Sequence, residues 1–433
     1  MQTLIKGARV IDPGHLDAPC DVLINGDRIE AVQPAGTLAV QGNGVTVVEA
    51  AGKWLTPGLI DLHVHFREPG QEYKETILTG SRAAAAGGFT AVCTMPNTDP
   101  VNDDPAITAL IRRKAETAGL VRVYPVAAIS KGSKGEQLSE FGELKAAGAV
   151  AVSDDGLPVM SSLLMRRALE YADGFGLLVI SHCEEMHLAA GGAMNEGPLA
   201  TRMGLAGIPN AAESIMVMRD IALAALTGAP VHIAHVSTRE SVTAIRRAKE
   251  EGIPVTAETA PHYFTLTEAA VAGYNTNAKM NPPLRTEADR QAIRQALAGG
   301  TLDAIATDHA PHAPMEKDVE FDRAPNGIIG LETALPLGLQ LVADGVLTIE
   351  TLITRMATTP ARILGLPTGV RPGQPADLTL IDPEATFEVQ AATMQSKSRN
   401  TPFENLRLKG RATMTIMGGK VTHQTPDGNP QPR

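Results

Sequence analysis

The chain has 433 residues, of which 43% are hydrophobic and 20% are charged, proportions that are ordinary for a globular protein. Its formal net charge of −10 at pH 7 argues against nucleic acid or an anionic membrane surface as the main partner, because both carry negative charge. The N-terminus has no signal-peptide core and no run approaches the ~20 apolar residues of a membrane span, so we expect a cytoplasmic protein without a membrane partner.

Short β-like segments separated by Gly, Pro, Asn and Asp lie at the two ends of the chain. They cover residues 3–12, 21–32, 376–382 and 411–423. We predict that residues 1–56 and 366–433 together form a small flanking β-sandwich domain. Its final stretch, residues 424–433, is polar and rich in proline and is predicted to be a disordered tail.

Residues 57–365 alternate eight short apolar runs with longer segments of helical period, which is the pattern of repeated βα units. The apolar runs are residues 59–65, 90–97, 121–130, 149–156, 176–183, 230–237, 254–262 and 303–312. Helical patterns lie at residues 74–87, 161–173, 211–228 and 238–252. We therefore predict an α/β fold, a (β/α)8 barrel of the TIM type, with its active site at the carboxyl ends of the strands.

The first apolar run belongs to the stretch "GLIDLHVHFREPG", which places Asp61, His63 and His65 at two-residue spacing. Because side chains alternate between the faces of a strand, we expect these three residues to share one face. Burying them without partners would cost on the order of 1–3 kcal/mol each, so a metal ion is a candidate partner. A chain with 11 histidines contains roughly 0.3 His-x-His pairs by chance, so the metal site depends on residues further along.

Ionisable residues end four of the later runs. They are Asp154 or Asp155, then His182, His235 and Asp308. In the sixth run we choose His235, because strand alternation turns His232 to the opposite face. A single strand-end histidine is often only hydrogen-bonded, and an aspartate there often caps the next helix. The convergence of four histidines and at least two carboxylates on one rim instead favours Zn²⁺ or a related divalent ion.

The number of candidate ligands exceeds what one tetrahedral site needs, so we expect two metal ions. Two cations ~3.5–4 Å apart lower the pKa of a bridging water and polarise a substrate carbonyl. Asp308 would take the proton of this water and deliver it to the leaving group. The predicted reaction is metal-assisted hydrolysis of an amide, an ester or a C–N bond.

Six segments taken together resemble the bacterial type of the dihydroorotase family, within the amidohydrolase superfamily. They are "GLIDLHVHFREPG", "TMPNTDP", "ISHCEE", "IAHVST", "KMNPPLR" and "ATDHAPH", in this order along nearly the whole chain. The resemblance implies a (β/α)8 barrel with a flanking β-domain. It also implies a zinc-dependent enzyme that interconverts N-carbamoyl-L-aspartate and L-dihydroorotate in pyrimidine biosynthesis.

The resemblance implies a role for each residue that matches a family motif. Two zinc ions per subunit would be held by His63, His65, Asp155, His182, His235 and Asp308, with Asp155 as the bridge. Many superfamily members bridge their metals with a carboxylated lysine, which the fourth run lacks, in agreement with dihydroorotases that use aspartate. The implied substrate-binding residues are His65, Arg67, Asn97, Asn281, His312, Asn326 and Gly327. Relatives usually have an aromatic residue where this chain has Asn326, so only the backbone contact carries over there.

Two other functions would use many of the same residues. A hydantoinase, a dihydropyrimidinase or an allantoinase would share the metal site, but Arg67 and the missing bridging lysine favour dihydroorotase. Some homologues are inactive scaffolds for aspartate carbamoyltransferase, but here every metal ligand is present. A homodimer and an association with aspartate carbamoyltransferase are both compatible with the resemblance.

Overall fold

The computed structural model describes residues 2–38 and 44–425, so most of the predicted tail, residues 426–433, lies outside the described residues. Eight parallel strands follow one another in chain order around a barrel. They are β6 (Leu59–Val64), β7 (Phe89–Thr94), β8 (Arg122–Ala127), β9 (Ala151–Val152), β10 (Leu178–Ser181), β13 (Val231–Ile233), β14 (Val255–Thr259) and β15 (Ala304–Ile305). A hydrogen bond of 2.8 Å from His65 N to His309 O links the ends of the first and last strands. The predicted barrel is therefore confirmed, with one strand from each apolar run.

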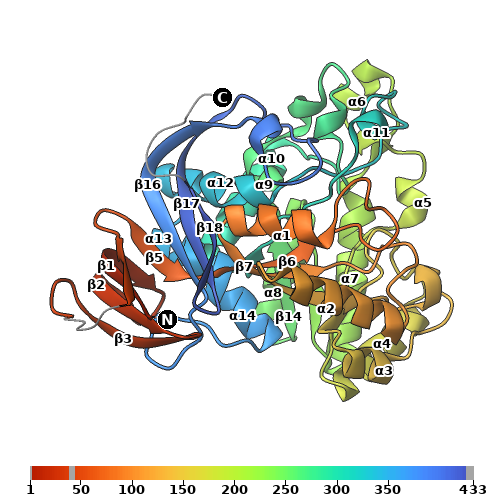
Figure 1. The fold of residues 1–433 in the computed structure, drawn as a ribbon. Helices are drawn as coiled ribbons and strands as arrows, with labels where there is room; N and C mark the ends of the chain where they lie inside the picture. The colour runs from red at the N-terminus through yellow and green to blue at the C-terminus, as the bar shows by residue number, and fades with distance from the viewer. Residues whose placement is uncertain (1, 39–43, 426–433) are drawn as a thin grey trace.

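Helices cover the outside of the barrel between successive strands (Figure 1). The longer ones are α1 (Ile77–Ala86), α2 (Pro105–Ala118), α4 (Ser162–Gly174), α7 (Asn210–Thr227), α8 (Arg239–Glu250), α10 (Glu287–Gly299) and α12 (Leu331–Ala343). The shorter ones are α3 (Phe141–Ala147), α5 (Met186–Ala189), α6 (Pro198–Met203), α9 (Pro261–Thr265), α11 (Pro314–Lys317), α13 (Ile349–Ile353) and α14 (Thr359–Leu364). Three of the predicted helices begin where a side chain accepts a backbone N–H, at Thr76, Ser161 and Thr238. Among the described residues, no helix is both long and apolar enough to cross a membrane.

Strands from both ends of the chain form a second sheet beside the barrel, where Figure 1 shows red and blue strands together. Its path runs through β18 (Lys420–Gln424), β17 (Arg407–Met417), β16 (Leu378–Glu388), β5 (Trp54–Pro57), β1 (Gln2–Asp12), β2 (Leu16–Asn25) and β3 (Arg28–Pro34), and β4 (Val45–Glu49) also pairs with β1. The antiparallel pairing of β5 with β16 joins the two chain ends. Buried residues such as Ile5, Val22 and Ile416 form a hydrophobic cluster of their own. The predicted fold class, a barrel with flanking β-structure built by both ends, is confirmed.

The flanking sheet supports the start of a barrel strand. The hydroxyls of Thr379 and Thr415 donate to the carbonyl oxygens of Gly88 and Ala85, at 2.6 and 2.7 Å. Ala85 lies in the last turn of α1 and Gly88 lies between α1 and β7, and β17 also packs against α12. The sheet therefore occupies the side where β7 begins, and the carboxyl ends of the strands remain available for a functional site.

Candidate metal centre and active site

Two groups of buried side chains that could bind metal lie at the carboxyl ends of the barrel strands and share Asp155. The first group is His63, His65 and Asp155, and the second is Asp155, His182 and His235. Asp155 Oδ1 lies 3.3 Å from His63 Nε2, and Oδ2 lies 3.4 Å from His65 Nε2. Oδ1 also lies 3.6 Å from His182 Nδ1 and 3.5 Å from His235 Nε2. One carboxylate thus lies between two pairs of imidazoles and could bridge two ions.

The neighbouring Asp154, which the sequence left as an alternative, has a different environment. It accepts hydrogen bonds from Ser130, from the backbone N–H at 3.0 Å and also from the hydroxyl. Burial raises the pKa of Asp154 to about 6, although the hydrogen bonds from Ser130 oppose the shift. Asp154 therefore holds the segment after β8 through hydrogen bonds, whereas Asp155 is the aspartate that faces the histidines.

Asp308 lies beside the first group, just past the end of β15, with a positive φ of 48°. Its Oδ1 lies 3.1 Å from His65 Nε2 and 3.7 Å from His63 Nε2. Burial opposes ionisation, but the hydrogen bond with His65 and the charge of His63 hold the pKa of Asp308 well below its usual value. The position fits both roles that we predict for Asp308, metal ligand and proton acceptor.

The position of His235 in the second group does not follow from the alternation of side chains along a strand. Strand β13 ends at Ile233, and His235 follows it with a positive φ of 33°, so the alternation of the strand no longer applies. His232 lies within the strand, where its Nε2 is 3.2 Å from Glu258 Oε2. The choice of His235 therefore depends on its place at a strand end, and His232 lies behind the site.

Asp61 connects the first and last strands of the barrel. Its Oδ1 accepts hydrogen bonds from His63 N at 3.1 Å and from Thr307 N at 3.0 Å. Burial raises the pKa of Asp61 to about 7, although the hydrogen bonds from Thr307 and His63 oppose the shift. We therefore explain the third polar residue of the "DLHVH" run by these backbone contacts, which hold His63 near Asp308.

A buried glutamate behind the first group was missed by the sequence analysis. Glu258 lies on β14, with Oε1 3.1 Å from His63 Nδ1 and Oε2 near His232. Burial opposes its ionisation, but the hydrogen bonds with His232 and His63 lower the pKa of Glu258 to about 2. A carboxylate that contacts His63 Nδ1 fixes the orientation of the ring, so that Nε2 can bind a metal. The only signal in the sequence was one glutamate within an apolar run.

A second glutamate has the corresponding place at the second group. Glu184 Oε2 lies 3.2 Å from His182 Nε2, and it accepts a hydrogen bond of 2.9 Å from Asn281 Nδ2. It was also missed, although it follows His182 closely in "ISHCEE". Glu184 therefore connects a candidate metal ligand with Asn281, a predicted substrate residue.

Asn97, another predicted substrate residue, contacts the outer ring nitrogen of His65. Asn97 Oδ1 lies 2.8 Å from His65 Nδ1. Since His65 Nε2 faces Asp155 and Asp308, a metal-binding ring carries its proton on Nδ1 and donates it to Asn97. The amide NH₂ of Asn97 then remains available to a ligand.

The other predicted substrate residues meet near the segment that follows β15. Arg67 is buried, and its Nε donates to the carbonyl oxygen of Pro311 at 3.2 Å. One of its Nη atoms lies 3.4 Å from His312 Nε2, which is itself 2.7 Å from Asn326 O. Burial and the charge of Arg67 lower the pKa of His312 to about 2, so this imidazole is neutral and donates to Asn326. Gly327 follows directly, so the predicted residues lie together.

A residue from the C-terminal part of the chain holds this cluster in place. Asn400 Oδ1 accepts a hydrogen bond of 3.0 Å from His312 N, and its Nδ2 donates to Ala310 O and Gly327 O, both at 3.0 Å. Asn400 lies between β16 and β17, so the chain of the flanking sheet reaches the site. No local pattern predicts this contact, because its partners are distant in the sequence.

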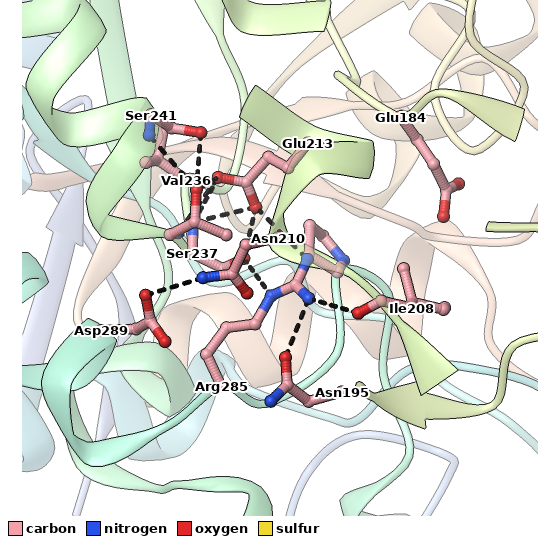
Figure 2. A network of polar contacts seen from close by, with 12 residues as sticks. Glu184, Asn195, Ile208, Asn210, Glu213, Val236, Ser237, Ser241, Arg285 and Asp289 are labelled. Atoms are coloured by element: carbon pink, nitrogen blue, oxygen red, sulfur yellow. Dashed lines mark hydrogen bonds and ion pairs between the residues drawn. The ribbon is translucent and has the colours of Figure 1, made fainter. Parts of the chain in front are cut away.

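A buried polar network fixes the segments around the second group (Figure 2). Glu213 on α7 accepts hydrogen bonds from the backbone N–H and hydroxyl groups of Ser237 and Thr238, in the loop after β13. Arg285 donates to Ser237 Oγ at 3.1 Å, Asn195 Oδ1 at 3.0 Å and Ile208 O at 2.9 Å. The network thus joins the loop that carries His235 to the segment that carries Asn281.

The side chains at the centre of the site fit a pair of divalent cations. His63 Nε2 and Asp155 Oδ1 are buried, and neither has a hydrogen-bond partner within the part of the chain that the structure describes. Imidazole nitrogen and carboxylate oxygen are both common ligands of Zn²⁺. Bound cations would therefore satisfy buried polar atoms that the protein itself leaves unpaired.

The barrel with its flanking sheet defines the fold, and two groups of candidate metal ligands share Asp155 at its rim. The same fold occurs in a dihydropyrimidinase from Brevibacillus agri, with a TM-score of 0.85 and 23% identity over 98% of this chain and 95% of the other. It also occurs in an L-hydantoinase from Arthrobacter aurescens, with a TM-score of 0.86 and 24% identity over 98% of this chain and 96% of the other. At these identities the likeness shows the fold alone.

Sequence comparison defines the family within this fold. The model of a family described as Dihydro-orotase-like matches residues 52–241. A dihydroorotase from Desulforapulum autotrophicum is 58% identical, over 97% of this chain and 98% of the relative. A dihydroorotase from Geobacter metallireducens is 56% identical, over 98% of this chain and 100% of the relative. The chain belongs to the dihydroorotase family and is a hydrolase of cyclic amides, as its motifs predict.

Proposed function

We propose that this chain interconverts L-dihydroorotate and N-carbamoyl-L-aspartate with two zinc ions per subunit. The proposed ligands are His63, His65 and Asp308 for one ion, His182 and His235 for the other, and Asp155 for both. The strongest support is the position of Asp155, whose carboxylate belongs to both groups of candidate ligands.

Bound cations of this kind lower the pKa of a water molecule and polarise the carbonyl group of a substrate. In the hydrolytic direction the water oxygen attacks the ring carbonyl carbon, and the ring C–N bond breaks. Asp308 takes a proton from the water and delivers it to the leaving nitrogen. In the direction of ring closure, the carbamoyl nitrogen attacks the side-chain carboxyl carbon, and Asp308 takes the proton of this nitrogen and gives it to the oxygen that leaves as water. Its contact of 3.1 Å with His65 Nε2 keeps the carboxylate beside the reacting groups.

The substrate carboxylate would bind to Arg67, Asn97 and His312, with the single N–H of His312 shared between the carboxylate and Asn326 O. Arg67 is buried, and its Nε is already bonded to Pro311 O, so its guanidinium is oriented before a ligand arrives. A fixed guanidinium suits a planar carboxylate, because it can donate two parallel hydrogen bonds. Asn97 adds an NH₂ donor, since its oxygen is bonded to His65.

The test combines metal analysis with assays in both directions. We expect close to two zinc ions per purified chain and turnover of both dihydroorotate and carbamoyl aspartate. Faster turnover of hydantoin or allantoin than of dihydroorotate would contradict the proposed substrate. A folded protein without zinc and without turnover would instead support the inactive scaffold.

The homodimer, the association with aspartate carbamoyltransferase and the cytoplasmic location belong to the same proposal. Sedimentation of the purified chain measures its mass in solution and therefore tests the homodimer. Repeating the sedimentation with aspartate carbamoyltransferase tests the association, and fractionation of cells tests the location.

A further inference from the structure

We infer that Glu184 sets the hydrogen-bonding polarity of Asn281, so that this asparagine presents an acceptor to an N–H group of the cyclic amide. The inference rests on the proposed function, because it concerns how the same site selects its substrate. Asn281 contacts the ligand in this scheme, and Glu184 is a positioning residue that acts through it.

The orientation of the Asn281 amide follows from the partner on its nitrogen side. Glu184 Oε2 lies 2.9 Å from Asn281 Nδ2. A carboxylate accepts hydrogen bonds and does not donate them, so only the NH₂ end of the amide can face Glu184. Asn281 Oδ1 then points away, and within the described part of the chain it has no hydrogen-bond partner. An N–H donor on a ligand would satisfy this oxygen.

The backbone around Asn281 is held, so the amide cannot easily adopt another position. The hydroxyl of Tyr263 donates to Pro282 O at 2.6 Å, immediately after Asn281. Arg285 anchors the end of the same segment through the network of Figure 2, in which Glu184 stands apart from the cluster around Arg285. Rotation of the side chain is the remaining freedom, and the bond to Glu184 removes it.

Asn97 is fixed in the opposite sense. Its Oδ1 accepts from His65 Nδ1 at 2.8 Å, so its NH₂ faces the ligand. One asparagine therefore offers a donor, which with Arg67 suits an anionic group, and the other offers an acceptor, which suits an N–H group. A cyclic amide that carries both a carboxylate and a ring N–H matches this pair, and a ring without the N–H leaves Asn281 Oδ1 unpaired.

Glu184 is itself held by the second metal-binding group. The same Oε2 atom lies 3.2 Å from His182 Nε2, while His182 Nδ1 faces Asp155 at 3.6 Å. Replacing Glu184 therefore has two effects, one on metal binding through His182 and one on the substrate through Asn281. A double-mutant cycle separates them, because only the second effect requires Asn281.

The first experiment compares dihydroorotate with analogues methylated at each ring nitrogen, as inhibitors of ring closure by the zinc-loaded enzyme. For one of the two positions, we expect the wild type to bind the analogue about 2- to 10-fold more weakly, the value of one neutral hydrogen bond. Glu184→Met should reduce this ratio toward one, because methionine has no oxygen that holds the NH₂ end of Asn281. Methionine is similar in length to glutamate, so the space for a methyl group is kept and the lost acceptor explains the reduction. Equal binding of dihydroorotate and both analogues by the wild type would overturn the inference without any variant.

The second experiment is the cycle of Glu184→Met and Asn281→Ala. We expect Glu184→Met to raise KM about 2- to 10-fold in the wild-type background and to leave it unchanged when Asn281 is alanine. Zinc affinity, measured by competition with a chelator, should fall equally in both backgrounds. The control is Glu185→Met, because Glu185 bonds to His187 and caps α5 instead, and KM and zinc affinity should stay at the wild-type values.

The outcomes distinguish the inference from the proposed function. A KM effect of Glu184→Met that persists at full size beside Asn281→Ala overturns the inference, because Glu184 would then act by another route. A wild-type protein that binds zinc but does not turn over dihydroorotate overturns the proposed function, whatever the cycle shows.

Discussion

Gly327 is a position where one added methyl group should disturb the substrate-binding cluster. Its φ of 125° lies in a region that residues with a side chain rarely adopt. A Cβ built on Gly327 would lie 2.5 Å from the Cβ of Ala310, 3.0 Å from Ala310 O and 3.3 Å from His312 Nε2. Carbon atoms pack favourably at about 3.5–4.0 Å, so the backbone must move to accept alanine.

The expected cost of Gly327→Ala has two parts. Backbone strain at such a φ costs of order 1–3 kcal/mol, and overpacking costs about 1–3 kcal/mol. The free energy of unfolding should therefore fall by about 2–6 kcal/mol. The movement that relieves the contact carries Asn326 O away from His312 Nε2, which it now meets at 2.7 Å. We therefore expect KM to rise more than kcat falls, because the disturbed residues bind substrate in our proposal.

Urea unfolding at a fixed zinc concentration, together with steady-state kinetics, measures both effects. The matched control is Gly273→Ala, because Gly273 has a positive φ of 75° but no atom within 4 Å of an added Cβ. The control should lose only about 1–2 kcal/mol and keep its KM. If Gly327→Ala matches the control in both stability and KM, the argument from close contact is wrong.

Three further predictions concern the metal centre and the segment beside it. Asp308→Asn should lower turnover at least about 100-fold while most zinc remains bound, and a substantial residual rate would remove Asp308 as the proton carrier. Glu258→Gln should weaken zinc binding about 10- to 100-fold in a chelator competition, because a neutral amide replaces the carboxylate that orients His63, and unchanged affinity would contradict that role. Burial and the nearby charge of Lys279 lower the pKa of Lys317 to about 7. The folded protein then binds fewer protons than the unfolded chain between about pH 7 and 10.5. The free energy of unfolding should therefore increase as pH rises in this range, by up to about 1.4 kcal/mol per pH unit. Lys317→Met should lack this rise in urea titrations at pH 7 and 9, and an equal rise in both proteins would contradict the shift.

Much of the fold could be predicted because the signals are local. Each barrel strand lies within a short apolar run. Each of the four predicted helices begins and ends within a few residues of its expected bounds. The candidate metal ligands could be predicted to lie together, because all carboxyl ends of parallel barrel strands share one rim. That argument needs only the order of residues along the chain, and it remains valid for His235 and Asp308, which lie past their strands with positive φ.

The residues behind the ligands could not be predicted, because their partners come from distant parts of the chain. Glu258 is 195 residues from His63, and Asn281 is 97 residues from Glu184. A single buried glutamate in an apolar run signals an unusual environment but does not identify the group that satisfies it. The contact of Asn400 with the substrate-binding cluster is similar, since it depends on how the flanking sheet meets the barrel.

The departure that the resemblance implies at Asn326 has a physical explanation in the structure. Asn326 is exposed, and the contact that it makes with His312 uses its carbonyl oxygen, which every amino acid has. The side chain can therefore change from aromatic to polar without loss of the contact. Gly327 has no such freedom, because it is buried and a Cβ would meet Ala310. Adjacent residues of one motif are thus constrained differently, according to whether the site uses the backbone or the space beside it.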